Sequence, residues 1–416
     1  MGRVVGILPE TAKSVFRTSL FLVLTASSGA AQTPSSSSLT LEAATERAFA
    51  ANPTIAAARL SSAAAAAGRA VAAERLNPEA TVEIEKETPK QAYGVAVPLE
   101  LGGKRSKRIA VSEATIRASE AELSATMAQV RNDVRRSYFD LLVASQRLTV
   151  LRELRDLSQR ARDTAQARFD SGDVPRLEVL QAELALNTAQ NEADSAAGVV
   201  VAAIARLNAL LGLPLDTAHQ LSTAIDAGGP RATNAVVELA RRESTELAVL
   251  DRRLDEQRAK LTLAHALRVP DVVPTATLTH DAEPEFTWGW RGGVAITLPL
   301  FATHKAGVAV EEATLAQISA ERQATQVRIE GAVSAAAATA DAHRQAYVRY
   351  RDVILPQALE VEQLAQDAYS LGRTGIASLL QALQSSRDVR LRSLDAVSQF
   401  QTALADLERA IGAPLP

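Results

Sequence analysis

The sequence predicts a mainly α-helical chain with a small β part, built as two copies of one unit. Three observations support this prediction. Long stretches without glycine or proline predict unusually long helices, and segments with alternating apolar residues predict strands. A set of landmarks also recurs in the same order in the two halves of the chain, which predicts an internal duplication.

Composition excludes several classes of protein. The 416 residues carry 45 Lys and Arg against 48 Asp and Glu, a net charge of -3, which argues against a nucleic-acid-binding protein. The chain has no cysteine, which excludes disulfides, thiolate metal sites and an N-terminal lipid attached to cysteine. No histidine pair has metal-ligand spacing, and no catalytic constellation or phosphate-binding loop occurs. We therefore expect neither an enzyme nor a bound metal or cofactor.

The N-terminus has the pattern of a secretory signal peptide. Basic residues precede the apolar run Leu20–Ala26, and small residues follow as far as Ala31. The pattern predicts a signal peptide over 1–31 with cleavage near Ala31, and then a disordered linker over 32–38. No later segment reaches about 18 consecutive apolar residues, so we expect no membrane-spanning helix.

The internal repeat defines the organisation of the mature chain. The segment Gly94–Leu101 recurs as Gly293–Leu300, and the turn glycine Gly172 recurs as Gly372. Further matched positions are Ala43 with Ala235, Ala48 with Ala240, Ile55 with Leu247, Pro78 with Pro270, Leu207 with Leu407 and Gly212 with Gly412. These matches predict a first repeat over 39–227 and a second over 228–416.

Each repeat should contain one or more leading helices, two strands, a very long helix and a further helix. In the first repeat the expected bounds are 79–87 and 91–101 for the strands, 104–170 for the long helix and 174–212 for the further helix. In the second repeat they are 272–280 and 286–300 for the strands, 305–370 for the long helix and 375–411 for the further helix.

The first long helix has the pattern of a coiled coil. The segment from Lys104 to Ser171 contains neither glycine nor proline, so about 65 residues can form one helix roughly 100 Å long. Apolar residues recur in heptads from Ile109 to Val130 and then change phase at Val134, which predicts coiled-coil packing with local unwinding. In the second long helix, Pro356 predicts a kink.

The strand segments alternate between apolar residues on one face and small or polar residues on the other. This pattern is typical of an outer-membrane barrel, although a strand of a soluble β-sandwich would share it. Aromatic residues on the apolar face predict a belt at the membrane interface, and the residues concerned are Tyr93, Phe286, Trp288 and Trp290.

Four strands cannot close a barrel in lipid, because open edges would leave unpaired backbone groups in hydrocarbon. Three chains would supply twelve strands and a ring of long helices, so we expect a homotrimer with a water-filled barrel. A soluble periplasmic coiled-coil scaffold would share the helices without the barrel, and it is the alternative from a different class of protein.

Several segments resemble the TolC-like outer-membrane factors of bacterial tripartite efflux and secretion systems. They are Leu39–Ala44, Arg168–Gly172, Tyr369–Gly372 and Leu207–Gly212, and the resemblance covers essentially the whole mature chain. Val97–Arg105 further resembles the subgroup that serves heavy-metal resistance pumps of the cobalt, zinc and cadmium type.

The resemblance implies a homotrimeric channel in the bacterial outer membrane, in contact with its lipid, with an α-barrel that extends into the periplasm. The implied partners are a periplasmic adaptor and an inner-membrane pump of the proton-driven resistance-nodulation-division class. The channel would be a passive exit duct, for heavy-metal cations if the subgroup is right. A drug-efflux or type I protein-secretion channel would use the same architecture.

The helix turns at Gly172 and Gly372 are the implied adaptor-docking tips, and a plain helix stop is the alternative. Family members often narrow the periplasmic mouth with acidic residues after the second tip glycine, but Ser378 and Gln381 occupy those positions here. The matching positions in the first repeat hold Glu178 and Gln181. A ring of three Glu178 carboxylates would favour cations, unless Glu178 is merely a solvated surface residue.

Overall fold

A computed structural model describes residues 38–222, 233–282, 284 and 286–415. The residues from Ser38 onward form one unit. The expected signal peptide over 1–31, its cleavage site near Ala31 and the linker as far as residue 37 lie outside the described residues.

The described chain is mainly helical with a small sheet, as the sequence predicts, and its two halves have the same order of elements. The first half contains α1 (Leu41–Ala51), α2 (Pro53–Ala72), β1 (Glu79–Ile84), β2 (Gln91–Ala96), α3 (Lys104–Asp170) and α4 (Arg176–Leu211). The second half contains α5 (Thr233–Glu243), α6 (Thr245–Ala266), β3 (Val272–Ala282), β4 (Phe286–Ile296), α7 (Lys305–Arg349), the π-helical turn η1 (Tyr350–Ile354), α8 (Leu355–Ser370) and α9 (Ile376–Ile411).

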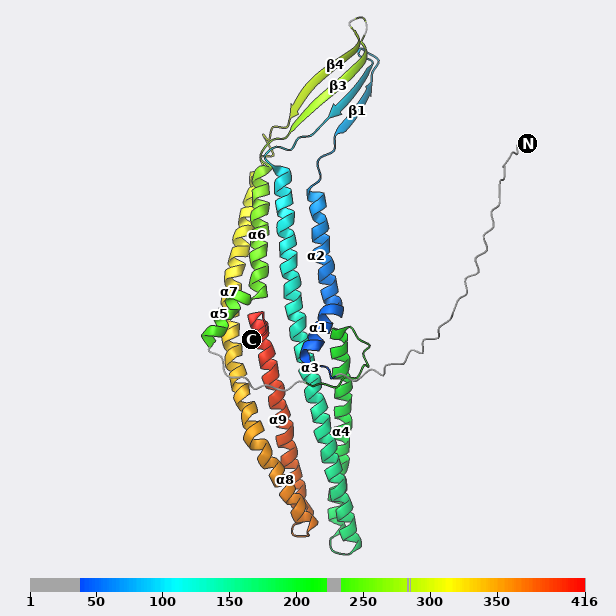
Figure 1. The fold of residues 1–416 in the computed structure, drawn as a ribbon, viewed down its shortest axis with the longest axis vertical. Helices are drawn as coiled ribbons and strands as arrows, with labels where there is room; N and C mark the ends of the chain where they lie inside the picture. Colours follow the sequence, from blue (N-terminus) through cyan, green and yellow to red (C-terminus); the bar gives the residue numbers. More distant parts are fainter. Residues whose placement is uncertain (1–37, 223–232, 283, 285, 416) are drawn as a thin grey trace, which may run out of the picture. The chain divides into compact units, whose positions relative to one another are not determined.

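The four strands form one antiparallel sheet in the order β1-β2-β3-β4 (Figure 1). The central pair, β2 and β3, joins the two halves of the chain, and β1 and β4 are the edges. Residues that share a row across the sheet share a face. One row contains Val82, Tyr93, Leu278 and Trp290, and the next contains Thr81, Gly94, Thr277 and Arg291. The alternation in the sequence therefore separates an apolar face from a polar face.

The strands do not have the bounds that the alternation predicts. β1 ends at Ile84, β2 at Ala96 and β4 at Ile296, each earlier than expected, whereas β3 continues to Ala282. Proline contributes to two of the early ends, because Pro274 on β3, which accepts from the N–H of Val97, has no N–H to donate in return, and Pro299 after β4 has none either. Beyond β2 the pairing continues through the N–H of Val97, which donates to the carbonyl of Pro274 at 3.1 Å, and through the bridge between Leu99 and Val272.

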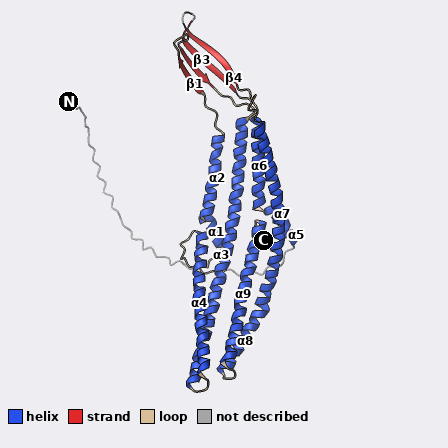
Figure 2. Cartoon of the chain, turned by 180° about the vertical axis from the view of Figure 1, so that it is seen from behind, coloured by secondary structure: helices blue, strands red, loops and turns tan. Residues whose placement is uncertain are grey.

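The long helix α3 connects the two halves. It packs against α1, α2 and α4 of the first half and against α6 and α9 of the second (Figures 1 and 2). Its buried residues around Val134, Tyr138 and Leu141 form a core with α1, α2 and α4. A second core surrounds Val333 and Leu407 in the other half. Apolar residues at helical spacing on the facing sides of these helices account for both cores.

One helix among the described residues, α4, is long and apolar enough by length and composition to cross a membrane. It packs along α3, with Val179, Ala193 and Leu207 buried. A helix of a bundle that carries apolar residues on more than one side meets the same length and composition criteria, so we interpret α4 as part of the bundle.

The helix pairs α1–α2 and α5–α6 are joined by capped turns. The side-chain oxygen of Asn52 accepts hydrogen bonds from the backbone N–H of Thr54 and Ile55, and its amide donates to the carbonyl of Leu210 at 2.9 Å. In the second half, the Ser244 hydroxyl accepts a hydrogen bond from the N–H of Leu247. Both residues are preferred N-caps because they satisfy the free donors at a helix start.

The second long helix differs from the first because it contains the π-helical turn η1. The stretch from Leu101 to Gly172 corresponds to the stretch from Leu300 to Gly372, which is one residue longer. A π-turn accommodates one extra residue without rotating the helix that follows it. The sequence predicts a kink at Pro356, and the structure places η1 directly before α8, with the proline in the first turn of α8.

Deleting Val353 from η1 should leave the fold intact, with stability changed by less than about 1 kcal/mol, because the turn can become an ordinary α-turn. Deleting Ala335 from α7 should reduce stability by at least about 3 kcal/mol, because the residues after it rotate and Ala340 and Tyr347 leave the core. Thermal unfolding followed by circular dichroism distinguishes the two variants. Equal losses would contradict the interpretation of η1 as an inserted residue.

The connection after α4 contains a histidine that should make stability depend on pH. The amide of Asn208 donates to the carbonyls of Leu215 and Thr217, so its oxygen accepts from Nε2 of His219 at 2.5 Å. Burial and then the charge of Arg47 lower the pKa of His219. The folded chain therefore favours the neutral ring, and its contribution to stability is present above about pH 6.5 and lost as the pH falls through the lowered pKa.

We accordingly expect His219→Gln to flatten the fall in melting temperature between pH 7 and pH 5. The matched control is His265→Gln, because His265 is an exposed histidine at the end of α6. If the pH dependence of the His219 variant equals that of the unmodified chain, the assignment of this titration to His219 is wrong.

Candidate functional site

Both helical hairpins end in the same glycine turn. At the first tip, Gly172 has φ of 83°, and the N–H of Asp173 donates to the carbonyl of Arg168 at 2.8 Å. At the second, Gly372 has φ of 68°, and the N–H of Arg373 donates to the carbonyl of Ala368 at 2.9 Å. The glycines satisfy the left-handed position that ends each helix. A Cβ would meet nothing within 4 Å at either position, so conformation and not space requires glycine there.

The two tips of one chain pack against each other. A buried cluster joins side chains from both hairpins, and its members are Ala161, Ala165, Val179, Ala182, Tyr369, Ile376, Leu379 and Leu383. The small alanines of the first hairpin let the larger side chains of the second approach closely. The hairpins are therefore coupled at their ends as well as through α3.

A cluster of polar groups lies within this contact between the tips. The guanidinium of Arg168 lies 5.3 Å from the centre of the Tyr369 ring, and Oε1 of Glu178 lies 3.9 Å from the position of a Cβ on Gly375. Burial raises the pKa of Tyr369, and the charge of Glu178 raises it further while Arg168 lowers it. Among the described residues, three buried atoms of this cluster lack a hydrogen-bond partner, namely Arg168 Nη1, Glu178 Oε2 and Tyr369 Oη, and Thr374 Oγ1 in the second tip turn also lacks one.

The fold therefore brings together only some of the pore-mouth residues that the sequence predicts. Glu178 is half-buried and faces the second tip of its own chain, whereas Ser378 is exposed. Gln181 and Gln381 line one groove of about 660 Å³ between the hairpins, together with Leu184, Leu380 and Arg387. The sequence analysis did not single out Arg168 and Tyr369 as members of the cluster, although both lie in the motifs that carry the family resemblance.

The predicted aromatic belt falls on the apolar face of the sheet. Tyr93, Trp288 and Trp290 share that face by register, and all three are exposed, Trp290 by 85%. The ring of Trp288 lies 4.2 Å from that of His280. The side chain of Phe286, the fourth predicted member, lies outside the described residues.

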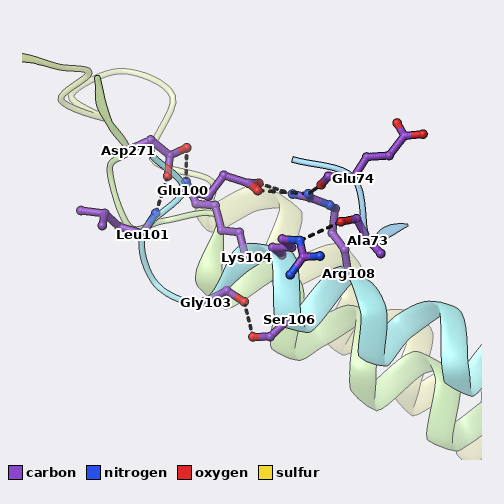
Figure 3. A network of polar contacts seen from close by, with 10 residues as sticks. Ala73, Glu74, Glu100, Leu101, Gly103, Lys104, Ser106, Arg108 and Asp271 are labelled. Atoms are coloured by element: carbon purple, nitrogen blue, oxygen red, sulfur yellow. Dashed lines mark hydrogen bonds and ion pairs between the residues drawn. The ribbon is translucent and has the colours of Figure 1, made fainter. Parts of the chain in front are cut away.

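A polar network fixes the passage from the helices to the sheet (Figure 3). The buried ammonium group of Lys104 binds the carboxylate of Asp271 at 2.7 Å, and the N–H of Leu101 donates to the same carboxylate at 3.0 Å. Burial alone would raise the pKa of Asp271, but these hydrogen bonds and the charges of Lys104 and Arg108 lower it below its ordinary value. The carboxylate is therefore held ionised between the two halves of the chain.

The same network holds the end of α2. Arg108 pairs with Glu100 and donates to the carbonyl of Glu74 at 3.1 Å, and Arg105 donates to the carbonyl of Ala73 at 2.7 Å. Carbonyls at a helix C-terminus lack intrahelical partners, so these arginines satisfy them. Throughout the described residues, this network included, no group of three or more His, Asp or Glu side chains is arranged to hold a metal ion.

Helical hairpins with paired tips, joined to a four-stranded sheet with an exposed aromatic face, place the chain in the class of outer-membrane channel proteins. The sequence pattern of the outer membrane efflux protein family matches residues 44–213 and 236–413, and the chain belongs to this family. Membership confirms the family resemblance and the expected outer-membrane location. This is a family of channels, not of enzymes.

Individual relatives agree with this assignment. The cobalt-zinc-cadmium resistance protein CzcC of Cupriavidus metallidurans is 24% identical over 341 residues, which cover 81% of both chains. Among solved structures, CusC has a TM-score of 0.72 at 16% identity and covers 90% of this chain and 92% of its own. The MtrE outer-membrane channel of Neisseria gonorrhoeae has a TM-score of 0.72 at 19% identity, with 90% and 89% covered. The structural similarities show the shared fold.

Proposed function

We propose that this chain forms the outer-membrane channel of a tripartite efflux system. Three copies would close a twelve-stranded barrel and continue as a helical duct. The observation that carries the proposal is the sheet itself, which has an apolar, aromatic-rich face and two unpaired edges, β1 and β4. Such edges can exist in lipid only if another copy pairs with them.

We further propose that the two halves, 39–227 and 228–416, arose by duplication of one unit. The repeated order of elements supports this, as does the identical hydrogen-bond pattern at Gly172 and Gly372. A duplicated protomer makes a trimer nearly sixfold, which suits a ring of similar helical hairpins around one channel.

The proposed cargo is heavy-metal cations, and the support is the similarity to a cobalt-zinc-cadmium resistance protein over most of the chain. The chain would be a passive duct, with energy and selection supplied by an inner-membrane pump of the proton-driven resistance-nodulation-division class and a periplasmic adaptor. A drug-efflux or type I secretion channel is the alternative of the same class. Restored cobalt, zinc and cadmium resistance in a strain that lacks this gene would favour the metal cargo over that alternative.

We place adaptor docking at the tips around Gly172 and Gly372, and the periplasmic mouth at Glu178, Gln181, Ser378 and Gln381. The tips are exposed, and each ends a hairpin in a compact turn. Glu178 would give the mouth of a trimer three carboxylates, each held against Gly375 and the Tyr369 cluster of its own chain.

The proposal is tested by the mass of the detergent-extracted protein and its single-channel conductance in a planar bilayer. We expect a trimer with discrete conductance, and Glu178→Gln should lower its preference for cations. Glu183→Gln is the matched control, because Glu183 is an exposed carboxylate on the same helix. A monomer without conductance would overturn the channel, whereas unchanged selectivity of Glu178→Gln would overturn only the role of Glu178.

A further inference from the structure

A cavity lies beside α3 where α9 and α6 meet end to end. Gly412 follows the last turn of α9, and a Cβ on it would lie 2.8 Å from the backbone N of Thr245 at the start of α6 (Figure 1). The cavity has a volume of about 450 Å³, and its walls come from these two helix ends and from α3 between Glu122 and Asn132. Sites for small organic molecules have volumes in this range.

The carboxylates on the walls of this cavity are already paired. Three glutamates line the cavity, and each forms an ion pair with an arginine that does not line it. The pairs are Glu122 with Arg253 at 2.8 Å, Glu246 with Arg328, and Glu408 with Arg135 at 2.7 Å. Because each of these carboxylates has a cationic partner outside the cavity, none of them is left to neutralise a cation on the walls.

Arg131 on α3 is a half-buried cation on the wall of the cavity. Within the described part of the chain it forms no ion pair, and its Nη2 lies 3.5 Å from the carbonyl oxygen of Gly412, which is longer than an ordinary hydrogen bond. Burial lowers the pKa of Arg131, and the charge of Glu408 offsets this change only in part. A half-buried guanidinium with an incompletely compensated charge attracts an anion into the space beside it.

Arg409 on α9 adds a second positive charge to the walls. It is exposed and forms no ion pair with the residues that the structure describes, although its charge also acts on Asp133. Arg409 lines a second cavity as well, of about 360 Å³ on the side of α7, where the other charged residues described are all paired. That second cavity lacks a half-buried cation like Arg131 among its described residues, so the inference concerns the first cavity.

The second half of the chain does not repeat the unpaired arginine. Because Leu101 matches Leu300 and the extra residue of the second long helix lies further on, in η1, Arg131 matches Glu330. Glu330 binds Arg241 at 2.8 Å. The two long helices therefore share their fold, but the first carries an unpaired charge where the second carries a paired one. The requirements of the shared fold do not account for Arg131.

We propose that this cavity binds a small organic anion, with a carboxylate of the ligand on Arg131. A guanidinium presents two parallel N–H groups that match the two oxygens of a carboxylate. The hydroxyl of Thr245 and the amide of Gln129 line the same cavity and can donate to a second polar group of the ligand. The bound anion links α3 to the junction of α6 and α9. This inference goes beyond the proposed channel, because one chain builds the whole site.

Isothermal titration calorimetry of the detergent-extracted full chain tests the site, with citrate as the probe and inorganic phosphate as the comparison at constant ionic strength. We expect one citrate per chain, bound at least about fivefold more tightly than phosphate, because phosphate lacks a second group to reach Thr245 and Gln129. Arg131→Gln should weaken citrate binding at least about tenfold. Arg152→Gln is the matched control and should leave binding unchanged, because Arg152 is an exposed arginine on the same helix.

Ala125→Leu tests the cavity separately, because it narrows the space and keeps Arg131, and it should also weaken citrate binding. Without citrate, Arg131→Gln should melt no lower than the unmodified chain, because the charge that it removes has no ion pair. Melting several degrees lower would assign Arg131 to the fold and overturn its role in binding.

Two further results would overturn the proposal. The site is wrong if citrate does not bind, or if Arg131→Gln weakens its binding no more than Arg152→Gln does. Phosphate that binds as tightly as citrate would overturn the organic ligand and indicate an adventitious ion only. None of these results affects the proposed channel, because its mass and conductance are measured separately.

Discussion

Replacing Gly412 with alanine should destabilise the chain by about 3 kcal/mol or more, whereas the same change at Gly372 should cost about 1 kcal/mol. Both glycines end a helix at positive φ, 85° and 68°. At Gly412, however, an added Cβ would lie 2.8 Å from the backbone N of Thr245 and 3.0 Å from Cα of Ser244. Backbone atoms of another helix junction cannot move aside cheaply, so the α5–α6 turn must shift.

Gly212 in the first half should behave like Gly412, because its Cβ would lie 2.8 Å from the carbonyl oxygen of Ala51. Gly172 should behave like Gly372, since nothing lies within 4 Å of its Cβ position. Melting temperatures of the four alanine variants provide the comparison. If the tip variants lost as much stability as the other two, close packing would not be the reason for glycine at Gly212 and Gly412.

Arg135→Ala should reduce stability by about 3–5 kcal/mol, while Arg136→Ala, one residue further along α3, should cost about 1 kcal/mol or less. Arg135 binds the carboxylate of Glu408 on α9 at 2.7 Å, and the Glu408 side chain is only 9% exposed. Without Arg135, the N–H of Leu415 still donates to that carboxylate and the charge of the half-buried Arg131 still acts on it, but the buried ion pair is lost. Arg136 instead pairs with Asp406, whose side chain is 48% exposed and can be hydrated when the pair is lost.

The double variant Arg135→Leu/Glu408→Leu separates the ion pair from its desolvation penalty. Removing both charges should recover most of the stability lost in Arg135→Ala, because no buried charge is then left unpaired. Urea unfolding of the three variants in one detergent gives the comparison. A double variant as unstable as the single one would mean that packing of the Arg135 side chain, and not the charge on Glu408, dominates.

The sequence was sufficient for the elements whose signal is local. A stretch without glycine or proline predicts α3 from Lys104 to Asp170 because helix formation depends on neighbouring residues. Alternation predicts which side of the sheet carries Trp288 and Trp290 because a strand turns its side chains to opposite faces at every residue. Strand ends were less well predicted, since pairing stops where the partner strand or a proline stops it.

The tertiary structure alone decided the contacts between residues distant in the sequence. The sequence does not reveal the neighbours of Glu178, whereas packing of the hairpins places it against Gly375, with its charge acting on Tyr369. Lys104 and Asp271 carry no mutual signal, yet the register of β2 on β3 and of α3 on α6 brings them to 2.7 Å. Spacing of a few residues encodes a helix or strand, but these pairs depend on the relative rotation and register of whole elements, which follow from the summed burial of many side chains.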